Sequence, residues 1–287
     1  MYTTIFDFPD IVPHLLYYFD IPSITAFKII SKSQYNLLSN IDFVNELYQL
    51  KQKQVTIKLI ILAAMNNYMA TLQWIHDSMH VFCFTSDTID CAAESGNLSI
   101  LQWFAQVYAD DFTYKHAIDN ASSNGHIHIL DWFSQLHCSN KHKFVYNYAI
   151  NKASEYGHIN VLEWFDKSPY KFDYCSLAID KASDNGHIHI LDWFNKSNYE
   201  FTYTESAIDW ASGNGHIKVL EWFDKSKHIF KYSAWAINHA SVNNHLHILE
   251  WFKNSIYEFR YSVYAIIHSK HKGNKKIIKF FKNNKNL

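Results

Sequence analysis

The chain has 287 residues, of which 48% are hydrophobic and 17% aromatic, and its formal net charge is −1. Disordered chains are poor in aromatic residues, so this composition predicts a folded protein. The near-neutral charge argues against a general electrostatic attraction to nucleic acid or to an anionic membrane. The four cysteines show no paired spacing, which argues against a disulfide scaffold and favours buried free thiols in a reducing compartment.

Residues 1–50 form a segment of their own, because they lack the repeat that follows. Apolar residues at helical spacing predict two or three short helices between residues 8 and 38, with Pro9 at a helix start and Ser23 as an N-cap. No basic residue precedes this stretch, so the region lacks the signature of a signal peptide. The apolar run at 59–65 is too short to span a bilayer. We therefore expect a soluble, intracellular protein.

A short repeat, with a period of about 29 residues, occupies the rest of the chain from position 55 to position 287. Its marker is a Trp-Phe pair or an equivalent apolar pair, and a Gly or Asn lies seven residues before each marker. The markers begin at residues 74, 103, 132, 164, 193, 222, 251 and 280. Six of the seven spacings are identical and one is three residues longer, which fixes a single register from the first marker to the last.

Each unit divides at its Gly or Asn. In residues 207–223, apolar residues at helical spacing predict a short helix before Gly215 and a second helix after it. Glycine can adopt the left-handed conformation that ends a helix, and asparagine, its usual substitute, stands at Asn67 and Asn244. Between units, a Phe-x-Tyr motif predicts a short extended segment whose two rings pack between neighbouring units.

A helix pair of this size buries too little apolar surface to fold by itself, so each unit must stack on its neighbours. The sequence therefore predicts an all-α solenoid of about eight repeats. The Trp-Phe pairs are expected to form its core. The lysine-rich segment at about 262–287 is expected to be its polar C-terminal cap.

The units read A-x-x-A-S/A-x-x-G-H-x-x-[IV]-[VL]-x-x-[LF]-[LF], a pattern that resembles the ankyrin repeat, with Trp222 and Phe223 at its paired-leucine position. The resemblance covers about four fifths of the chain and implies a helix-loop-helix solenoid that binds proteins. The period is shorter than the ankyrin period of about 33 residues, which implies shortened loops. This aromatic, Asn- and Lys-rich variant is similar to ankyrin-repeat proteins of giant DNA viruses.

The N-terminal segment resembles an F-box. The motifs that carry this resemblance are Phe-Pro-Asp-Ile at residues 8–11, Phe-Asp-Ile-Pro-Ser-Ile at 19–24 and Ile-Ser-Lys at 30–32. An F-box docks on a Skp-family adaptor of a cullin–RING ubiquitin ligase. The alternative is that these helices only cap the first repeat. By the resemblance, the adaptor contacts would be Pro9, Ile11, Leu15, Leu16 and Ile24.

Neither the histidines nor the acidic residues form a catalytic or metal-binding pattern. Eight of the eighteen histidines follow the Gly or Asn of a unit or lie two residues further on, and an i, i+2 pair points to different faces of a helix. Equivalent histidines in stacked repeats are expected roughly 8–10 Å apart, too far to share a zinc ion. The acidic residue before each Trp recurs singly, without the partner that acid–base catalysis needs. We expect no enzyme activity, no metal and no cofactor.

The first helices vary most at the two positions that flank the Ala-Ile pair. These positions are four residues apart and therefore share one helix face. In ankyrin-like stacks the first helices line the concave groove, so we expect a protein partner to bind this stripe, with the aromatic residues as its main anchors. The ten residues are His116, Asn120, Tyr148, Lys152, Leu177, Lys181, Ser206, Trp210, Trp235 and His239.

The leading functional hypothesis is an adaptor that recruits a protein through the solenoid and couples it to a ubiquitin ligase through its N-terminal segment. The alternative is a scaffold or sequestering protein without that coupling. The lysine-rich end contains no arginine after Arg260, which argues against nucleic acid as the partner. We expect a monomer in the cytoplasm, or in the host cytoplasm for a viral protein; a nuclear location is the alternative.

Overall fold

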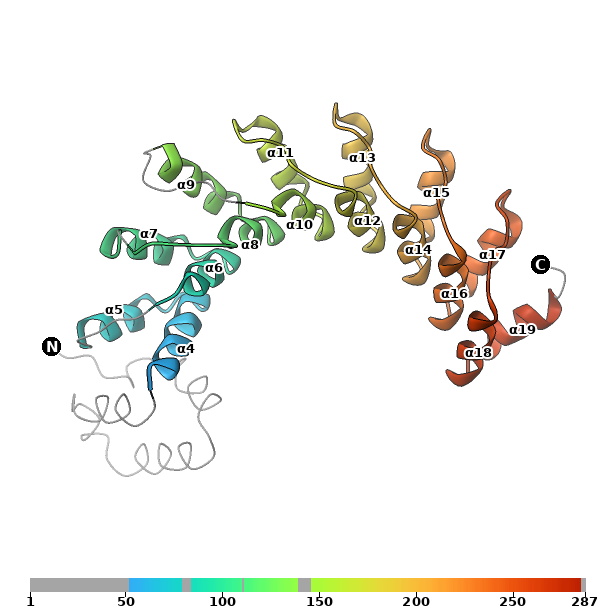
Figure 1. The fold of residues 1–287 in the computed structure, drawn as a ribbon, viewed down its shortest axis with the longest axis horizontal. Coiled ribbons are helices and arrows are strands. Elements are labelled where there is room, and N and C mark those ends of the chain that lie inside the picture. The colour runs from blue at the N-terminus through green and yellow to red at the C-terminus, as the bar shows by residue number, and fades with distance from the viewer. Residues whose placement is uncertain (1–51, 79–83, 110, 139–145, 285–287) are drawn as a thin grey trace, which may run out of the picture. The chain divides into compact units, whose positions relative to one another are not determined.

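The computed structural model describes residues 52–78, 84–109, 111–138 and 146–284. Within these ranges the protein is all-helical, with sixteen helices and no strand (Figure 1). The all-α prediction is therefore confirmed for the described part of the chain. The predicted F-box-like segment lies outside it, and so do its five expected adaptor contacts, Pro9, Ile11, Leu15, Leu16 and Ile24.

The chain divides into two compact units, one of residues 1–118 with 132–145 and one of residues 119–131 with 146–287. In the first unit, α4 packs on both α5 and α6, and α6 packs on α7. Their shared core contains fully buried Ile60, Leu72, Ile89 and Phe104. The bounds of these helices are α4 Gln52–Met65, α5 Met69–Ser78, α6 Ser86–Glu94 and α7 Leu98–Val107; α8 (Ala117–Ser123) and α9 (Ile127–Cys138) are divided between the units.

The second unit contains five complete helix pairs. The first helices of these pairs pack side by side in one row (Figure 1); they are α10, α12, α14, α16 and α18. The second helices form another row, which contains α11, α13, α15, α17 and α19. The bounds are α10 Ala149–Glu155, α11 Ile159–Lys167, α12 Leu177–Asp184, α13 Ile188–Lys196, α14 Ser206–Gly213, α15 Ile217–Lys225, α16 Ala234–Val242, α17 Leu246–Asn254, α18 Val263–His271 and α19 Lys275–Asn283.

The turn inside each pair is the predicted left-handed one. Gly215 has φ +78°, the His216 N–H donates to the carbonyl of Ala211 at 2.8 Å, and the Gly215 N–H donates to that of Ser212 at 3.1 Å. These two bonds form a Schellman motif, which satisfies carbonyls that the helix end leaves free. The two asparagines that replace glycine also have positive φ, 59° at Asn67 and 65° at Asn244.

The glycine has a second role, because the next repeat packs directly on it. A Cβ atom added at Gly215 would lie 2.7 Å from the Nδ1 atom of His245. The same contact recurs one repeat earlier, where a Cβ at Gly186 would lie 2.8 Å from Nδ1 of His216. The Gly-His motif therefore joins consecutive repeats: the histidine of one covers the bare backbone of the one before.

A buried polar side chain links each first helix to the next. Asp180 accepts hydrogen bonds from the backbone N–H of Thr204 at 2.9 Å and from its hydroxyl at 2.8 Å. Asn238 accepts from the backbone N–H of Ser262 and donates to its hydroxyl, both at 3.0 Å. The same position in the other repeats of this unit holds Asp119, Asn151 and Asp209. Asp119 accepts from the backbone N–H groups of Asn147 and Tyr148, Asn151 from that of Cys175, and Asp209 from that of Ser233.

Burial raises the pKa of Asp180, although the hydrogen bonds from Thr204 act in the opposite direction. The pKa of Asp90 and the pKa of Asp209 are also raised, and burial is again the main cause. Compared with water, the fold therefore makes the charged carboxylate less favourable at these positions, and an asparagine amide, which is always neutral, can take the same place.

The linkers hold an aromatic ladder rather than strands. Phe201 stacks on the His228 ring, with centroids 3.9 Å apart, and on the Trp222 indole at 5.5 Å, and these two rings lie 6.0 Å from each other. The Tyr232 hydroxyl donates to the carbonyl of Glu258 in the next linker at 2.6 Å. Both rings of the Phe-x-Tyr motif thus pack as predicted.

The prediction that both members of each Trp-Phe pair lie in the core needs a correction. The phenylalanines are buried, with Phe223 at 1% exposure, whereas Trp222 and its described equivalents are half-buried. They lie at the edge, where the indole N–H groups of Trp164 and Trp222 donate to Asp131 and Asp192 at 2.7 Å. An indole needs a polar partner when it is covered, and the edge supplies one.

The expectation of buried cysteines is also wrong at Cys175, which is exposed, while Cys91 is half-buried. Cys175 lies in the linker before α12, and its backbone N–H donates to Asn151 at 3.3 Å. Its place is set by this backbone bond and not by burial of the thiol.

Replacement of Gly215 by Ala should lower the free energy of unfolding by about 2–4 kcal/mol, since the left-handed conformation costs about 1–2 kcal/mol for Ala and the contact with His245 adds a similar strain. Gly273 is the matched control, because it has φ +71° and no neighbour within 4 Å of the added Cβ. Gly273→Ala should lower the free energy of unfolding only by the cost of the left-handed conformation. Urea unfolding of both variants, and of Gly215→Ala combined with His245→Ala, measures the two contributions. Equal costs at the two glycines, or no recovery in the double variant, would contradict the packing role.

Asp180→Asn should stabilise the protein at pH 7 by up to about 1 kcal/mol. The folded-state pKa of Asp180 is raised, so its contribution to stability is full below the unfolded pKa of about 3.9 and is lost as the pH rises through the folded pKa. The advantage of Asn should therefore vanish near pH 4, which urea unfolding at both pH values would measure. Asp180→Leu leaves the Thr204 N–H without its acceptor and should cost about 1–3 kcal/mol at either pH. A pH-independent difference between wild type and Asp180→Asn would disprove this account.

Candidate protein-binding surface

The first-helix stripe of the second unit consists of the predicted residues from Asn120 to His239. In the first helices α10 to α16, the Ala-Ile pair is buried against neighbouring helices, for example Ala207 and Ile208 in α14. The stripe residues lie on the flank that this packing leaves open. Because the first helices stand side by side, the flank is repeated from α10 to α16.

Three apolar side chains of the stripe are exposed. The exposed fractions are 56% at Tyr148, 50% at Trp235 and 39% at Leu177. Apolar residues at the inner positions of the same helices, such as Ile179, are 0% exposed. This contrast within single helices marks the stripe as a surface on which large apolar side chains are maintained without burial.

Two lysines of the stripe are held by neighbours. The Lys181 ammonium lies 4.5 Å from the ring centre of Trp210 and 3.0 Å from the Asp184 carboxylate. Lys152 forms the equivalent pair with Glu155 at 2.8 Å, and this hydrogen bond raises the pKa of Lys152. Trp210, which is half-buried, is therefore oriented by a cation above its ring and is the best fixed of the predicted anchors.

An aromatic cluster occupies the end of the stripe on α16 and α18. The ring centroids of Trp235 lie 4.9 Å from His239 and 5.5 Å from Tyr264, and Tyr264 lies 3.9 Å from His268. Tyr264 and His268 were not among the predicted residues. They stand one repeat period after Trp235 and His239, so the repeat register already contained the signal.

The remaining predicted positions add little exposed apolar surface to the stripe. Ser206 and Asn120 are half-buried. His116 is exposed and belongs to the first unit, where its backbone N–H donates to Asp90 at 3.0 Å. The sequence also missed Tyr156, which is 54% exposed and lies 5.7 Å from the Lys152 ammonium.

Several described histidines outside the stripe have structural partners. Nε2 of His189 lies 2.8 Å from the Gly157 carbonyl, and Nε2 of His247 lies 2.9 Å from that of Gly215. Burial and the neighbouring histidines lower the pKa of His187 and of His245. In the described ranges, no group of three or more His, Cys, Asp or Glu side chains could hold a metal ion.

No protein-family model matches the chain, and no curated protein matches it either. Among the described helices, none combines the length and the apolar character that a membrane span requires. The functional argument therefore depends on the surface itself and on the sequence motifs.

Proposed function

We propose that this chain is an ankyrin-like repeat protein that binds a partner protein through the first-helix stripe. The exposed aromatic residues on a regular row of helices are the observation that supports this proposal most directly. Trp235, Tyr148 and the oriented Trp210 have the residue types that dominate binding energy at protein interfaces. A row of short helices holds such anchors at fixed intervals, so the partner meets a surface that needs little ordering.

The N-terminal F-box-like motifs extend the proposal to an adaptor role. In this role, residues 1–50 engage a Skp-family adaptor through Pro9, Ile11, Leu15, Leu16 and Ile24, while the stripe holds the protein to be ubiquitinated. The support for this part is the sequence resemblance alone. Without the adaptor contact, the same stripe makes the protein a cytoplasmic scaffold or sequestering protein.

The double variant Trp210→Ala/Trp235→Ala should lose the partner, with at least about a tenfold reduction in capture from lysate of the native cell. Because Trp235 is half exposed and Trp210, although half-buried, lies outside the fully buried core, this variant should lower the thermal midpoint far less than a core replacement does. Ile256→Ala, at a residue 92% exposed in a linker, is the surface control and should capture the partner normally. Phe252→Ala, at a residue 1% exposed, is the stability control and should cost about 3–5 kcal/mol. Equal capture by the wild type and the double variant would contradict the proposal that the stripe binds the partner.

The adaptor role predicts that the full chain pulls down a Skp-family adaptor and that deletion of residues 1–40 abolishes this association. The deletion should leave capture by the stripe unchanged, because the stripe lies on α8 to α16. Absence of adaptor binding above the deletion control would leave the scaffold as the function.

A further inference from the structure

The end of the stripe on α16 and α18 carries a continuous chain of aromatic and histidine rings. The two helices pack side by side in the row of first helices (Figure 1). Successive ring centroids lie 4.9, 5.5, 3.9 and 6.3 Å apart, in the order His239, Trp235, Tyr264, His268 and His271. The chain of rings therefore crosses from one first helix to the next on the stripe side.

Two exposed apolar side chains of α18 adjoin these rings. Val263 is 69% exposed and Ile267 is 44% exposed. They are four residues apart and share one helix face, which borders the face of Tyr264. In α16 the position of Ile267 is held by Asn238, which is 3% exposed because the next repeat covers it. The stripe thus widens at α18 into a larger apolar surface.

Cations without an acidic neighbour stand at the C-terminal end of α18. Lys270, His271 and Lys272 are exposed, and neither α16 nor α18 contains an acidic residue. Among the ion pairs of the described residues, none includes Lys270 or Lys272. The helix dipole favours cations at this end, but it does not account for the apolar side chains exposed beside them. This part of the stripe attracts carboxylates.

Elsewhere in the stripe the chain neutralises its own cations. Lys152 pairs with Glu155 at 2.8 Å, and Lys181 pairs with Asp184 at 3.0 Å. The position of these two acids is occupied in α16 and α18 by Val242 and His271. The carboxylate that α10 and α12 supply to the stripe is therefore missing from α16 and α18, and a partner can supply it.

We propose that this end of the stripe binds an acidic segment of the partner protein that also carries a large apolar side chain. The apolar side chain packs on Trp235, Val263 and Ile267. The carboxylates pair with Lys270 and Lys272, and the neighbouring histidine rings donate N–H groups to them, which imidazole can do in either protonation state. The proposal rests on the function proposed above, because the segment belongs to the partner that the stripe holds.

The helix sets the spacing within the segment. Val263 and Lys272 are nine residues apart, which is about 13 Å along a helix and about four residues of an extended chain. The apolar residue of the segment should therefore lie about four positions from the centre of its carboxylates.

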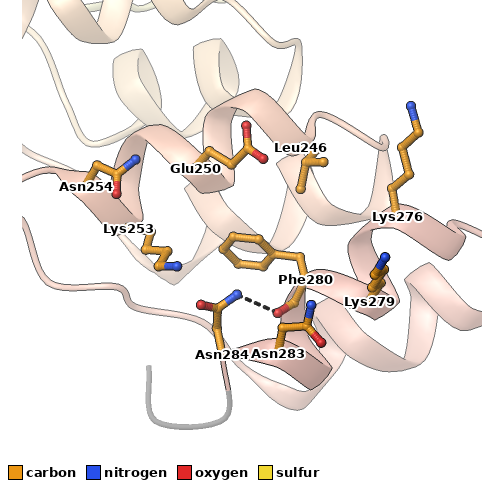
Figure 2. Close-up of a pocket in the computed structure, with 9 residues that line it drawn as sticks. All are labelled: Leu246, Glu250, Lys253, Asn254, Lys276, Lys279, Phe280, Asn283 and Asn284. Atoms are coloured by element: carbon orange, nitrogen blue, oxygen red, sulfur yellow. Dashed lines mark hydrogen bonds between the residues drawn. The ribbon is translucent and has the colours of Figure 1, made fainter.

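The second helices of the same repeats offer no comparable surface. A pocket of about 650 Å³ lies between α17 and α19 (Figure 2). The ring of Phe280 lies in its middle, but at 8% exposure it has no open face for a partner's side chain. Trp235, at 50% exposure, has one.

A protein segment fits this surface better than a nucleic acid does. Affinity for nucleic acid grows with the number of phosphates that are neutralised, and the lysines of the stripe on α10 and α12 are already paired with acids. Arginine is the better phosphate ligand, and the one arginine of the chain, Arg260, is paired with Glu258 at 2.8 Å.

The test is fluorescence anisotropy with the full chain and a labelled peptide, Gly-Phe-Ser-Gly-Ser-Asp-Glu-Asp. It uses about 150 mM salt, where a Debye length of about 8 Å limits general attraction. The Lys270→Glu/Lys272→Glu variant should bind the peptide at least about tenfold more weakly. The matched control, Lys279→Glu/Lys282→Glu, makes the same charge change at exposed residues of α19 and should bind within about twofold of the wild type.

The apolar contact is tested separately. Val263→Ser/Ile267→Asn should weaken binding at least about fivefold. Leu177→Ser, at an exposed apolar residue of the stripe on α12, is its control and should bind as the wild type does. The peptide Gly-Ser-Gly-Ser-Phe-Asp-Glu-Asp has the same composition but places Phe next to the carboxylates, so it should bind more weakly than the first peptide.

The proposal is overturned if the wild type does not bind the peptide, if the α19 control loses binding as the α18 lysine variant does, or if Val263→Ser/Ile267→Asn binds normally. Tighter binding of a single-stranded DNA of about eight nucleotides than of the peptide would also overturn it. So would self-association that Val263→Ser/Ile267→Asn abolishes, since the occupant would then be a second copy. If the α18 lysine variant fails to fold by circular dichroism, Val263→Ser/Ile267→Asn decides, because both side chains are exposed.

These outcomes are distinct from a failure of the proposed function. If the peptide results overturn the acidic segment while Trp210→Ala/Trp235→Ala still loses the captured partner, the stripe binds a partner of other chemistry. Equal capture by that variant and the wild type contradicts the stripe itself.

Discussion

The hydrogen bonds from each buried Asp or Asn to the backbone that opens the next first helix are the constraint on which the second unit depends. The backbone N–H groups that open these helices are part-buried, and leaving one of them unpaired is costly, so each repeat supplies the acceptor that its successor requires. The link fixes the spacing of the first helices and turns the same flank of each toward solvent. Exposed Trp235 and buried Asn238 are three residues apart on one helix, and the second fixes the position of the first.

A second link acts at the C-terminal end of the first helix, where a histidine ring of the next repeat covers the glycine that ends this helix. Together the two links hold a first helix at its start and at its end. The second helices and the linkers are held in a different way, by stacked aromatic rings and by tyrosine hydroxyls that donate to a carbonyl of the next linker. The Tyr232 hydroxyl, for example, donates to the carbonyl of Glu258. Residues of the stripe can therefore vary without disturbing what holds the repeats together.

The sequence predicted the helix pairs, the left-handed turns and the exposure of Tyr148 and Trp235, because these follow from local spacing and from glycine. It did not predict the role of Asp180, since the acceptor and its donor Thr204 lie in different repeats and no local pattern joins them. Trp222 was assigned to the core because helical spacing places it beside buried Phe223, and only the packing shows that it lies at the edge.

Ile267 stands in α18 at the position that Asp or Asn occupies in all the first helices from α6 to α16. An isoleucine side chain cannot accept a hydrogen bond, so α18 cannot receive another repeat in the way that its predecessors do. The acceptor that joins consecutive first helices in the rest of the row is therefore absent at α18, and any structure that covers this helix must be held by other contacts.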